Sequence, residues 1–394
     1  MLWVDKYRPT DLVSLDYHDD ISHRLESLAK NPASLPHLFF YGKSGAGKRT
    51  RISAFLGALF GPSAQKLKLT QRVFTTPTGK AVEIHMISSD YHIEISPGDA
   101  GNNDRFVIQD VLKDIASSKN IRSSVANMQE MMGHKSETNA DNDDPKSDSE
   151  EVDEEMDTTA DNTAVVETDI KVVVLHQVDR LTKQAQAALR RTMEKYAATC
   201  RLILCCDSPS KLIAPLRSRC LGIRVAAPSE DEIAKILKTV ASGEEFRLPN
   251  SVAIKLAGES DRNLRKALLM LEAAKVQADG EIQENQHLPT TDWEIYVRQL
   301  AAQITKEQSP QTLMAAREKL YELLVNCIPA STILKSLTGE LLNNLDDSVK
   351  LEVIQWASFY EHRIAVGSKD IFHLEAFVAK FMAIYKKYLN DLFG

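Results

Sequence analysis

The sequence predicts an α/β fold for the first part of the chain, with a parallel sheet between layers of helices, and helical structure for the rest. One apolar run, residues 38–41, leads into a glycine-rich loop and then into a helical pattern. Further apolar runs of strand length alternate with helical patterns as far as residue 225. Beyond Pro228 only helical periodicity remains. We therefore expect a five-stranded parallel sheet followed by two helical domains.

The expected strands are short and mostly apolar, as in strands that are buried on both faces of a sheet. They cover residues 38–41, 82–88, 172–175, 202–206 and 221–225. Helices are expected at 21–29, from Arg105 onward, at 181–196, and at 372–392, where the pattern is amphipathic. A capping-box sequence, Ser229-Glu230-Asp231-Glu232, predicts a helix start. Boundaries near 227 and 285 divide the chain into domains 1–227, 228–285 and 286–394.

The glycine-rich loop has the spacing of a phosphate-binding P-loop, Gly42-x4-Gly47-Lys48. In such a loop, backbone N–H groups and a helix N-terminus point at phosphate oxygens, and the lysine adds a positive charge. A chance glycine-rich turn is the alternative, but the strand before the loop and the helix after it argue against that. The candidate nucleotide-binding residues of the loop are Gly42, Lys43, Ser44, Gly45, Ala46, Gly47, Lys48, Arg49 and Thr50.

Three positions that normally handle a magnesium ion carry the wrong residues. The residue after the P-loop lysine is usually Ser or Thr, whose hydroxyl holds Mg²⁺, and here it is Arg49. The strand at 172–175 is followed by His176 and Gln177, where P-loop ATPases place an Asp and often a Glu. Because hard Mg²⁺ prefers oxygen ligands, His176 is a poor substitute. We expect a site that binds nucleotide, hydrolyses it poorly and holds no metal.

Two further segments are each open to two interpretations. Residues 2–9 end at a proline, and Val4, Tyr7 and Arg8 either form a packed N-terminal arm or wrap around the adenine of a nucleotide. Asp104 is a plausible helix N-cap, and Arg105 follows it in the first turn, where the helix dipole disfavours a cation. A phosphate from outside the chain would resolve that conflict, and a solvated arginine is the alternative.

Composition limits the class of protein. The chain has 394 residues, 43% of them apolar, which suits two or three domains with real cores. No apolar run is long enough to cross a membrane, and the N-terminus does not have the form of a signal peptide. The five cysteines lack metal-site spacing and are expected to be mostly buried thiols.

The acidity of the chain is local. Residues 134–169 contain 14 Asp and Glu against two lysines, a net charge of −12. Because the whole chain has a net charge of −7, the rest of the chain has a net charge of +5. This stretch belongs to an aperiodic segment at about 120–169, which we expect to be a disordered acidic insertion.

Several segments together resemble the small subunits of eukaryotic replication factor C, the AAA+ clamp loader. They are Trp3-Val4-Asp5-Lys6-Tyr7-Arg8-Pro9, Phe40-Tyr41-Gly42 through Thr50, Ala188-Leu189-Arg190-Arg191-Thr192-Met193-Glu194-Lys195-Tyr196, and Ser218-Arg219-Cys220. The resemblance covers essentially the whole chain except the acidic insertion, and it is strongest to the subunit with a degenerate ATPase site. It implies an AAA+ P-loop domain, a small helical lid domain and an all-α collar domain that joins five subunits.

The resemblance also implies roles for single residues. ATP or ADP is expected at subunit interfaces, with Arg219 acting in trans as an arginine finger and Arg190 as a second interfacial cation. Asn263 and Arg265 resemble the lid residue that senses phosphate, and Asp207 stands where a sensing Asn is usual. The implied partners are the other replication factor C subunits, the sliding clamp PCNA and primer–template DNA, in the nucleus.

DNA contacts in this family come from helix N-termini that follow the phosphate backbone. Arg105 is the first candidate here, with Lys113 and Lys183 as weaker ones. Two rival functions remain open at this point, an autonomous P-loop enzyme and a scaffold that binds no nucleotide. The residues at 49, 176 and 177 argue against the first of them.

Overall fold

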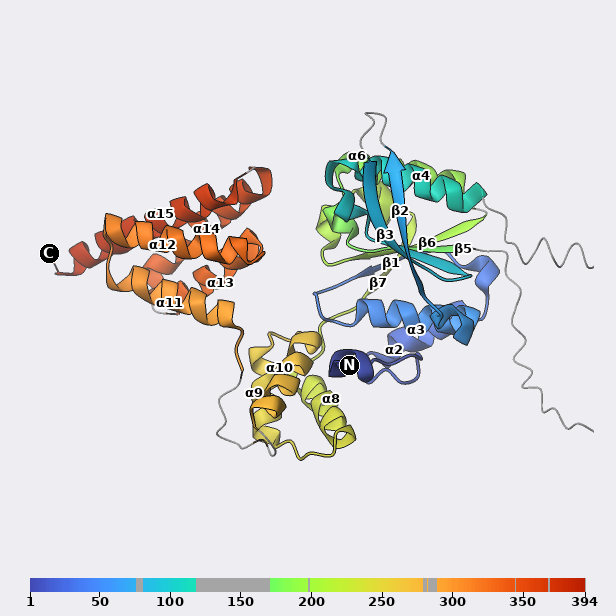
Figure 1. Cartoon of the computed structure of the whole chain (residues 1–394), viewed down its shortest axis with the longest axis horizontal. Helices are drawn as coiled ribbons and strands as arrows, with labels where there is room; N and C mark the ends of the chain where they lie inside the picture. Colours follow the sequence, from blue (N-terminus) through green and yellow to red (C-terminus); the bar gives the residue numbers. More distant parts are fainter. Residues whose placement is uncertain are drawn as a thin grey trace, which may run out of the picture. The chain divides into compact units, whose positions relative to one another are not determined.

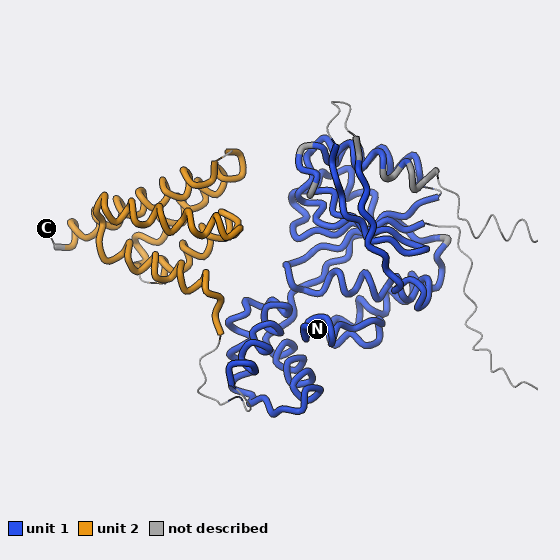
Figure 2. Tube along the Cα trace, viewed as in Figure 1, with its two compact units in different colours: residues 1–286 blue, residues 287–394 orange. Residues whose placement is uncertain are grey.

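The computed structural model describes residues 1–75, 81–117, 171–197, 199–278, 282, 289–343, 345–367 and 369–393. The chain divides into two compact units, Met1–Gln286 and His287–Gly394, which are coloured separately in Figure 2. The acidic segment predicted at about 120–169 lies outside the described residues. None of the described helices is long and apolar enough to cross a membrane.

The first unit is built around one sheet, which has seven strands over the described residues, in the order β2-β3-β4-β5-β6-β1-β7. The strands are β1 His37–Tyr41, β2 Lys68–Thr75, β3 Ala81–Ser88, β4 His92–Ile95, β5 Lys171–Leu175, β6 Cys200–Cys206 and β7 Cys220–Arg224. The five neighbours from β4 to β7 run parallel, whereas β2, β3 and β4 pair antiparallel.

The prediction of five strands is therefore wrong in two respects. The segment 82–88 is β3, which is antiparallel, and the fifth parallel strand is the unpredicted β4. Polar and apolar side chains alternate in β4 as in a half-buried strand, but the strand has only four residues, which is the shortest length at which this pattern is informative. β2 extends the sheet as one arm of an antiparallel hairpin, and it carries exposed apolar side chains at Leu69 and Val73.

Helices cover both faces of this sheet because its central strands bury side chains on both sides. Alternate residues of β1 belong to different cores: Phe39 packs in one cluster, and Leu38 and Phe40 pack in the other. The helices are α2 Asp19–Ala29, α3 Lys48–Phe60, α4 Asp104–Ser117 and α6 Lys183–Lys195. In Figure 1, α4 and α6 lie on one face of the sheet and α2 and α3 on the other.

The rest of the first unit is helical. Its helices are α1 Trp3–Lys6, α7 Ala214–Arg217, α8 Glu230–Gly243, α9 Asn250–Glu259 and α10 Leu264–Gln277. The predicted capping box at the start of α8 is confirmed, with Ser229 and Glu232 bonded reciprocally. The short α1 is anchored on this helical part, because the Trp3 backbone N–H donates to Glu272 at 3.2 Å and its ring stacks on Phe246.

The second unit is a helical bundle with its own core. Its helices are α11 Asp292–Lys306, α12 Pro310–Val325, α13 Ala330–Leu342, α14 Asp347–Val366 and α15 Asp370–Phe393. Apolar side chains from all five helices fill the interior, mostly leucine, isoleucine and phenylalanine, with valines from α14. α15 covers the segment in which the amphipathic C-terminal helix was predicted, and it buries Leu374, Phe377 and Phe381.

Candidate nucleotide-binding site

The P-loop residues form a tight turn between β1 and α3. Gly45 and Gly47 have φ values of +78° and +75°, which favour glycine. α3 begins at Lys48 without a side-chain cap, so its first-turn N–H groups are available to a ligand. The Lys48 ammonium lies over the loop and donates to the Gly42 and Lys43 carbonyls at 2.6 and 3.0 Å. It also pairs with Asp207 Oδ1 at 2.7 Å.

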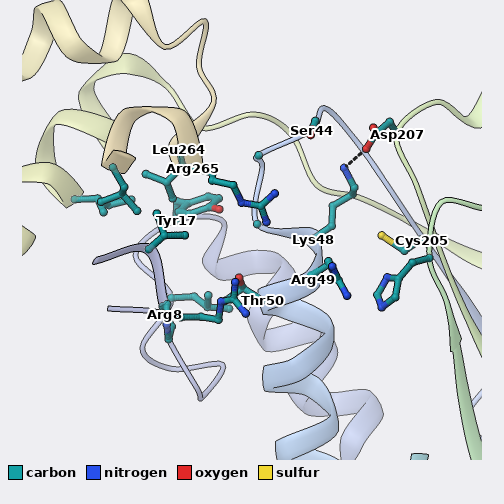
Figure 3. A pocket seen from close by; sticks show the side chains of 18 of the residues that line it. Arg8, Tyr17, Ser44, Lys48, Arg49, Thr50, Cys205, Asp207, Leu264 and Arg265 are labelled. Atoms are coloured by element: carbon teal, nitrogen blue, oxygen red, sulfur yellow. Dashed lines mark hydrogen bonds and ion pairs between the residues drawn. The ribbon is translucent and has the colours of Figure 1, made fainter. Parts of the chain in front are cut away.

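A cavity of about 240 Å³ opens in front of this loop. Its phosphate side is lined by Ser44, Gly45, Gly47, Lys48, Arg49 and Thr50. Its other side is largely apolar and is lined by Val4, Leu15, Ile236, Val240, Leu264 and Leu268, beside Tyr7 and Tyr17. Figure 3 shows Lys48 pointing toward Asp207 and Arg265 entering from α10. A polar end rich in N–H donors and an apolar slot suit a nucleotide.

The N-terminal segment supports the P-loop through a hydrogen bond and close packing. Tyr17 Oη donates to the Ala46 carbonyl at 3.0 Å, and a Cβ at Gly47 would lie 2.3 Å from that hydroxyl. The Arg51 side chain is fully buried behind it and donates to the Tyr17 carbonyl and to Ser22 Oγ. Burial of the phenol, only partly offset by Arg51, raises the pKa of Tyr17. The hydroxyl therefore stays protonated and keeps donating to the loop.

Residues just before α10 contact the P-loop directly. Asn263 caps α10, and its amide is so close to Gly45 that a Cβ at Gly45 would overlap it. Lys43 Nζ pairs with Asp261 at 2.8 Å and donates to the Asp261 carbonyl at 2.7 Å.

Four of the candidate residues do not line the cavity: Gly42, Lys43, Ala46 and Asn263. They shape the loop instead, because their partners are Lys48, Asp261, Tyr17 and Gly45 rather than open space. Ten candidates do line it, namely Val4, Tyr7, Arg8, Ser44, Gly45, Gly47, Lys48, Arg49, Thr50 and Arg265.

The end of β5 carries a buried cluster of two histidines and a carboxylate. His176 Nε2 and Glu94 Oε2 are 2.9 Å apart, and His92 Nε2 lies 3.7 Å from Glu94 Oε1. Burial alone would favour the protonated carboxyl, but the hydrogen bond with His176 and the nearby His92 imidazole outweigh it, and the pKa of Glu94 falls well below its usual range. Arg49 Nη2 approaches the same carboxylate at 3.8 Å. The Glu94 carboxylate is therefore ionised at neutral pH.

The residues around the cavity fit a nucleotide better than a magnesium ion. Oxygen ligands at the pocket wall come from Asp179, Asp207 and the Thr50 hydroxyl, but Asp207 is already paired with Lys48. In the part of the chain that the structure describes, no three His, Cys, Asp or Glu side chains are grouped to hold a metal. His176 Nε2 is already hydrogen-bonded to Glu94, and among the described residues its buried Nδ1 has no hydrogen-bond partner.

Three of the five cysteines are buried, as predicted, and Cys220 is half-buried. Cys205 and Cys206 line the cavity, and burial raises the pKa of their thiols to about 11 and about 12. Burial likewise raises the pKa of Cys200 and of Cys220 to about 11. Cys327, in the second unit, is exposed.

Arg219 lies at the surface, just after α7. Its Nη2 pairs with Glu194 Oε1 at 2.5 Å, its Nη1 donates to the Pro215 carbonyl at 2.9 Å, and 38% of the side chain is exposed. Arg190 Nε is 3.8 Å from the same Glu194 oxygen, one helical turn away on α6. The structure thus brings the two predicted interfacial cations together on one carboxylate, away from the cavity lining.

The three candidate DNA-contacting residues are exposed on α4 and α6: Arg105, Lys113 and Lys183. Asp104 was expected to cap α4, but it is buried and accepts from the Thr182 N–H and hydroxyl at 2.7 and 3.0 Å. Thr182 is itself the N-cap of α6. Asp104 therefore ties the start of α4 to the start of α6, next to Arg105 and Lys183.

Comparisons with known proteins agree with this architecture. Family models match residues 17–229 (DNA polymerase III, delta subunit), 235–276 (RCF1/5-like, AAA+ ATPase lid domain) and 293–389 (replication factor C subunit 3, C-terminal domain). Replication factor C subunit 3 of Mus musculus is 48% identical over 390 residues, covering 99% of this chain and 98% of that protein. This chain belongs to the replication factor C subunit 3/5 family.

Other members of the replication factor C family match along nearly all of their length. The probable subunit 3 of Dictyostelium discoideum is 48% identical over 98% of this chain and 99% of that protein, and subunit 5 of Oryza sativa is 44% identical over all of both. Membership makes this chain a clamp-loader subunit of DNA replication, with an AAA+ α/β domain, a helical lid and an all-helical C-terminal domain.

Sequence reasoning missed several residues of this replication factor C site. Glu94 was not singled out, because its partner His176 is 82 positions away and the two meet only through the pairing of β4 with β5. Asp179 and Leu15 line the cavity from short connecting segments that carry no motif. Leu264 and Leu268 could have been found, because they lie on the apolar face of the helix that carries Arg265.

Proposed function

We propose that this chain is the regulatory subunit of the replication factor C clamp loader that binds ATP or ADP, hydrolyses it poorly and lends Arg219 to a neighbouring subunit. It works in a heteropentamer with the other replication factor C subunits, in the nucleus, where the assembly loads PCNA onto primer–template DNA. The observation that carries the proposal is the contrast within one cavity. Phosphate-binding groups are intact, while Arg49 and His176 occupy the positions that handle the metal.

Nucleotide binding is supported by the donors and by the shape of the cavity. Lys48, the N-terminus of α3 and Arg265 meet at its polar end, and the apolar slot between α8, α10 and the N-terminal arm suits a purine. A bound nucleotide supplies negative charge between the sheet domain and the lid. Lys48 then exchanges Asp207 for phosphate, and the Asp207 carboxylate, left near the terminal phosphate, disfavours the build-up of charge that hydrolysis needs.

Arginine-finger action in trans is supported by the setting of Arg219. Glu194 and the Pro215 carbonyl hold the guanidinium at the surface, and a side chain already ordered there loses less entropy when it meets a partner's phosphate. Such a finger contributes on the order of 10³–10⁵ in rate to the site that receives it. Arg190, on the same carboxylate, adds a second positive charge to that surface.

Contact with DNA is supported by the N-termini of α4 and α6. Arg105 and Lys183 stand in the first turns of these helices, and Lys113 follows along α4. Helix N-termini and cations attract phosphate without regard to base sequence, as loading at any primer end requires.

The decisive experiment compares two variants in the reconstituted heteropentamer. We expect Lys48→Ala to leave the total ATPase nearly unchanged, because this chain's own site contributes little. We expect Arg219→Ala to lower the rate of ATP hydrolysis at the receiving site at least about a thousandfold. This removes that site's whole share of the total ATPase activity. Steady-state phosphate release with PCNA and primed DNA measures both.

Arg217→Ala is the matched control, because Arg217 is an exposed arginine of α7 two residues from Arg219. Equal losses of ATPase activity from Lys48→Ala and Arg219→Ala would contradict the proposal that this chain's own site contributes little while Arg219 serves a neighbour's site. Turnover of ATP by the isolated chain would favour an autonomous P-loop enzyme instead. A chain that binds neither ADP nor ATP would be a scaffold.

A further inference from the structure

We propose that the Arg49 guanidinium supplies in this pocket the positive charge that magnesium supplies in other P-loop sites, so that the chain binds ADP and ATP without a divalent cation. The inference rests on the proposed nucleotide binding and adds a metal-independent mode to it. Glu94 is the residue that positions Arg49 for this role.

The position of Arg49 is the first argument. It stands one residue after Lys48 in the first turn of α3 and lines the cavity, as Figure 3 shows. Its side chain is 55% exposed, and it approaches Glu94 with one nitrogen at 3.8 Å. A guanidinium has five N–H donors, so this loose contact, the one that Arg49 makes within the described part of the chain, orients the group without using all of its donors. Among the described residues, the remaining donors are left to meet phosphate oxygens.

The rigidity of Glu94 is the second argument. Its side chain is only 13% exposed, and it lies between the imidazoles of His176 and His92. Both histidines are buried, and the register of β4 against β5 fixes Glu94 beside the end of β5. A carboxylate so held cannot follow Arg49 into the cavity. It therefore acts as a fixed anchor for Arg49.

The third argument is that the same residues cannot also hold the metal. The hydroxyl normally found at position 49 is absent, and the end of β5 offers an imidazole already bonded to Glu94. An ion placed there would also meet the repulsion of the neighbouring guanidinium. Charge for the phosphates comes instead from side chains, since Lys48, Arg49, Arg8 and Arg265 all line one cavity.

The test measures the affinity of ADP and ATP for the full-length chain by calorimetric titration, in buffer with magnesium and in buffer with EDTA. For the native chain we expect the two dissociation constants to differ by less than about threefold, because the side chains carry the phosphate charge. Arg49→Thr removes the guanidinium and restores a hydroxyl. We expect it to bind about tenfold more weakly in EDTA, the loss of one charge-assisted hydrogen bond.

Two further variants make the result specific. Arg49→Lys keeps the charge but loses the planar fork, and we expect its EDTA affinity to lie between those of the native chain and Arg49→Thr. Arg24→Thr removes an exposed arginine of α2 that does not line the cavity, and it should bind like the native chain. Circular dichroism and the melting temperature show whether each variant is folded. If Arg49→Thr does not fold, the comparison of Arg49→Lys with the native chain decides.

The outcomes separate this inference from the proposed function. Native binding that needs magnesium, or an Arg49→Thr chain that binds like the native one in EDTA, overturns the role of Arg49 and leaves nucleotide binding standing. The absence of ADP and ATP binding in both buffers overturns nucleotide binding itself.

Discussion

The ionisation of the Glu94 side chain depends on the residues around it. It is a nearly buried carboxylate that His92, His176 and Arg49 face from three different segments. Because its folded-state pKa lies below the unfolded value, the ionised form stabilises the fold. That contribution is fully present above the unfolded pKa of about 4.3, and it is lost as pH falls below that value.

A Glu94→Gln variant should therefore be less stable than the native chain by about 1–3 kcal/mol at pH 7. The difference in the free energy of unfolding should stay constant between about pH 6 and 8 and shrink below about pH 4.5. Urea unfolding of both chains across this range measures it. Glu83→Gln, on the exposed surface of β3, is the matched control and should change little. A difference that grows on acidification would contradict the assignment.

At the scale of helices and strands, local pattern predicted some elements and failed for others. The P-loop and its flanking β1 and α3 were predictable, because glycines, lysine and helical spacing are all local signals. β4 was missed because four alternating residues acquire strand structure only by pairing with β3 and β5. The phosphate-sensing role of Asn263 stays a prediction; that its amide caps α10 and packs on Gly45 is something spacing alone does not reveal.

The start of α4 yields a prediction about DNA. Asp104 ties it to α6, so Arg105 is presented from a fixed helix end. In the assembled loader, Arg105→Ala should weaken binding to primed DNA of any sequence and lower the slope of log affinity against log salt by about 1. Fluorescence anisotropy at several salt concentrations measures this slope. Arg24→Ala removes an exposed arginine elsewhere and should leave it unchanged, and equal slopes for Arg105→Ala and the native chain would exclude a phosphate contact.

At the scale of the whole molecule, the chain consists of two units with separate cores. The nucleotide cavity belongs to the first unit alone, since all of its lining residues precede residue 286. A ligand that binds only the folded first unit stabilises that unit and not the second.

We accordingly expect calorimetric unfolding of the full chain to show two transitions, of which ADP raises only one. At a concentration 100 times the dissociation constant, ADP should stabilise the first unit by about 2.7 kcal/mol. Lys48→Ala should abolish this shift without moving the other transition. A single transition, or one in which ADP shifts both parts equally, would mean that the two units unfold together.

The distribution of thiols in these two units has a practical consequence. Four cysteines stand in the first unit with thiol pKa values raised to about 11 or 12, so very little nucleophilic thiolate forms there at neutral pH. Cys327 alone is exposed. A maleimide dye should therefore attach once, in the helical bundle, giving a spectroscopic reporter without any engineered substitution. Peptide mass mapping should find the adduct at residue 327 in the native protein and at all five cysteines after denaturation.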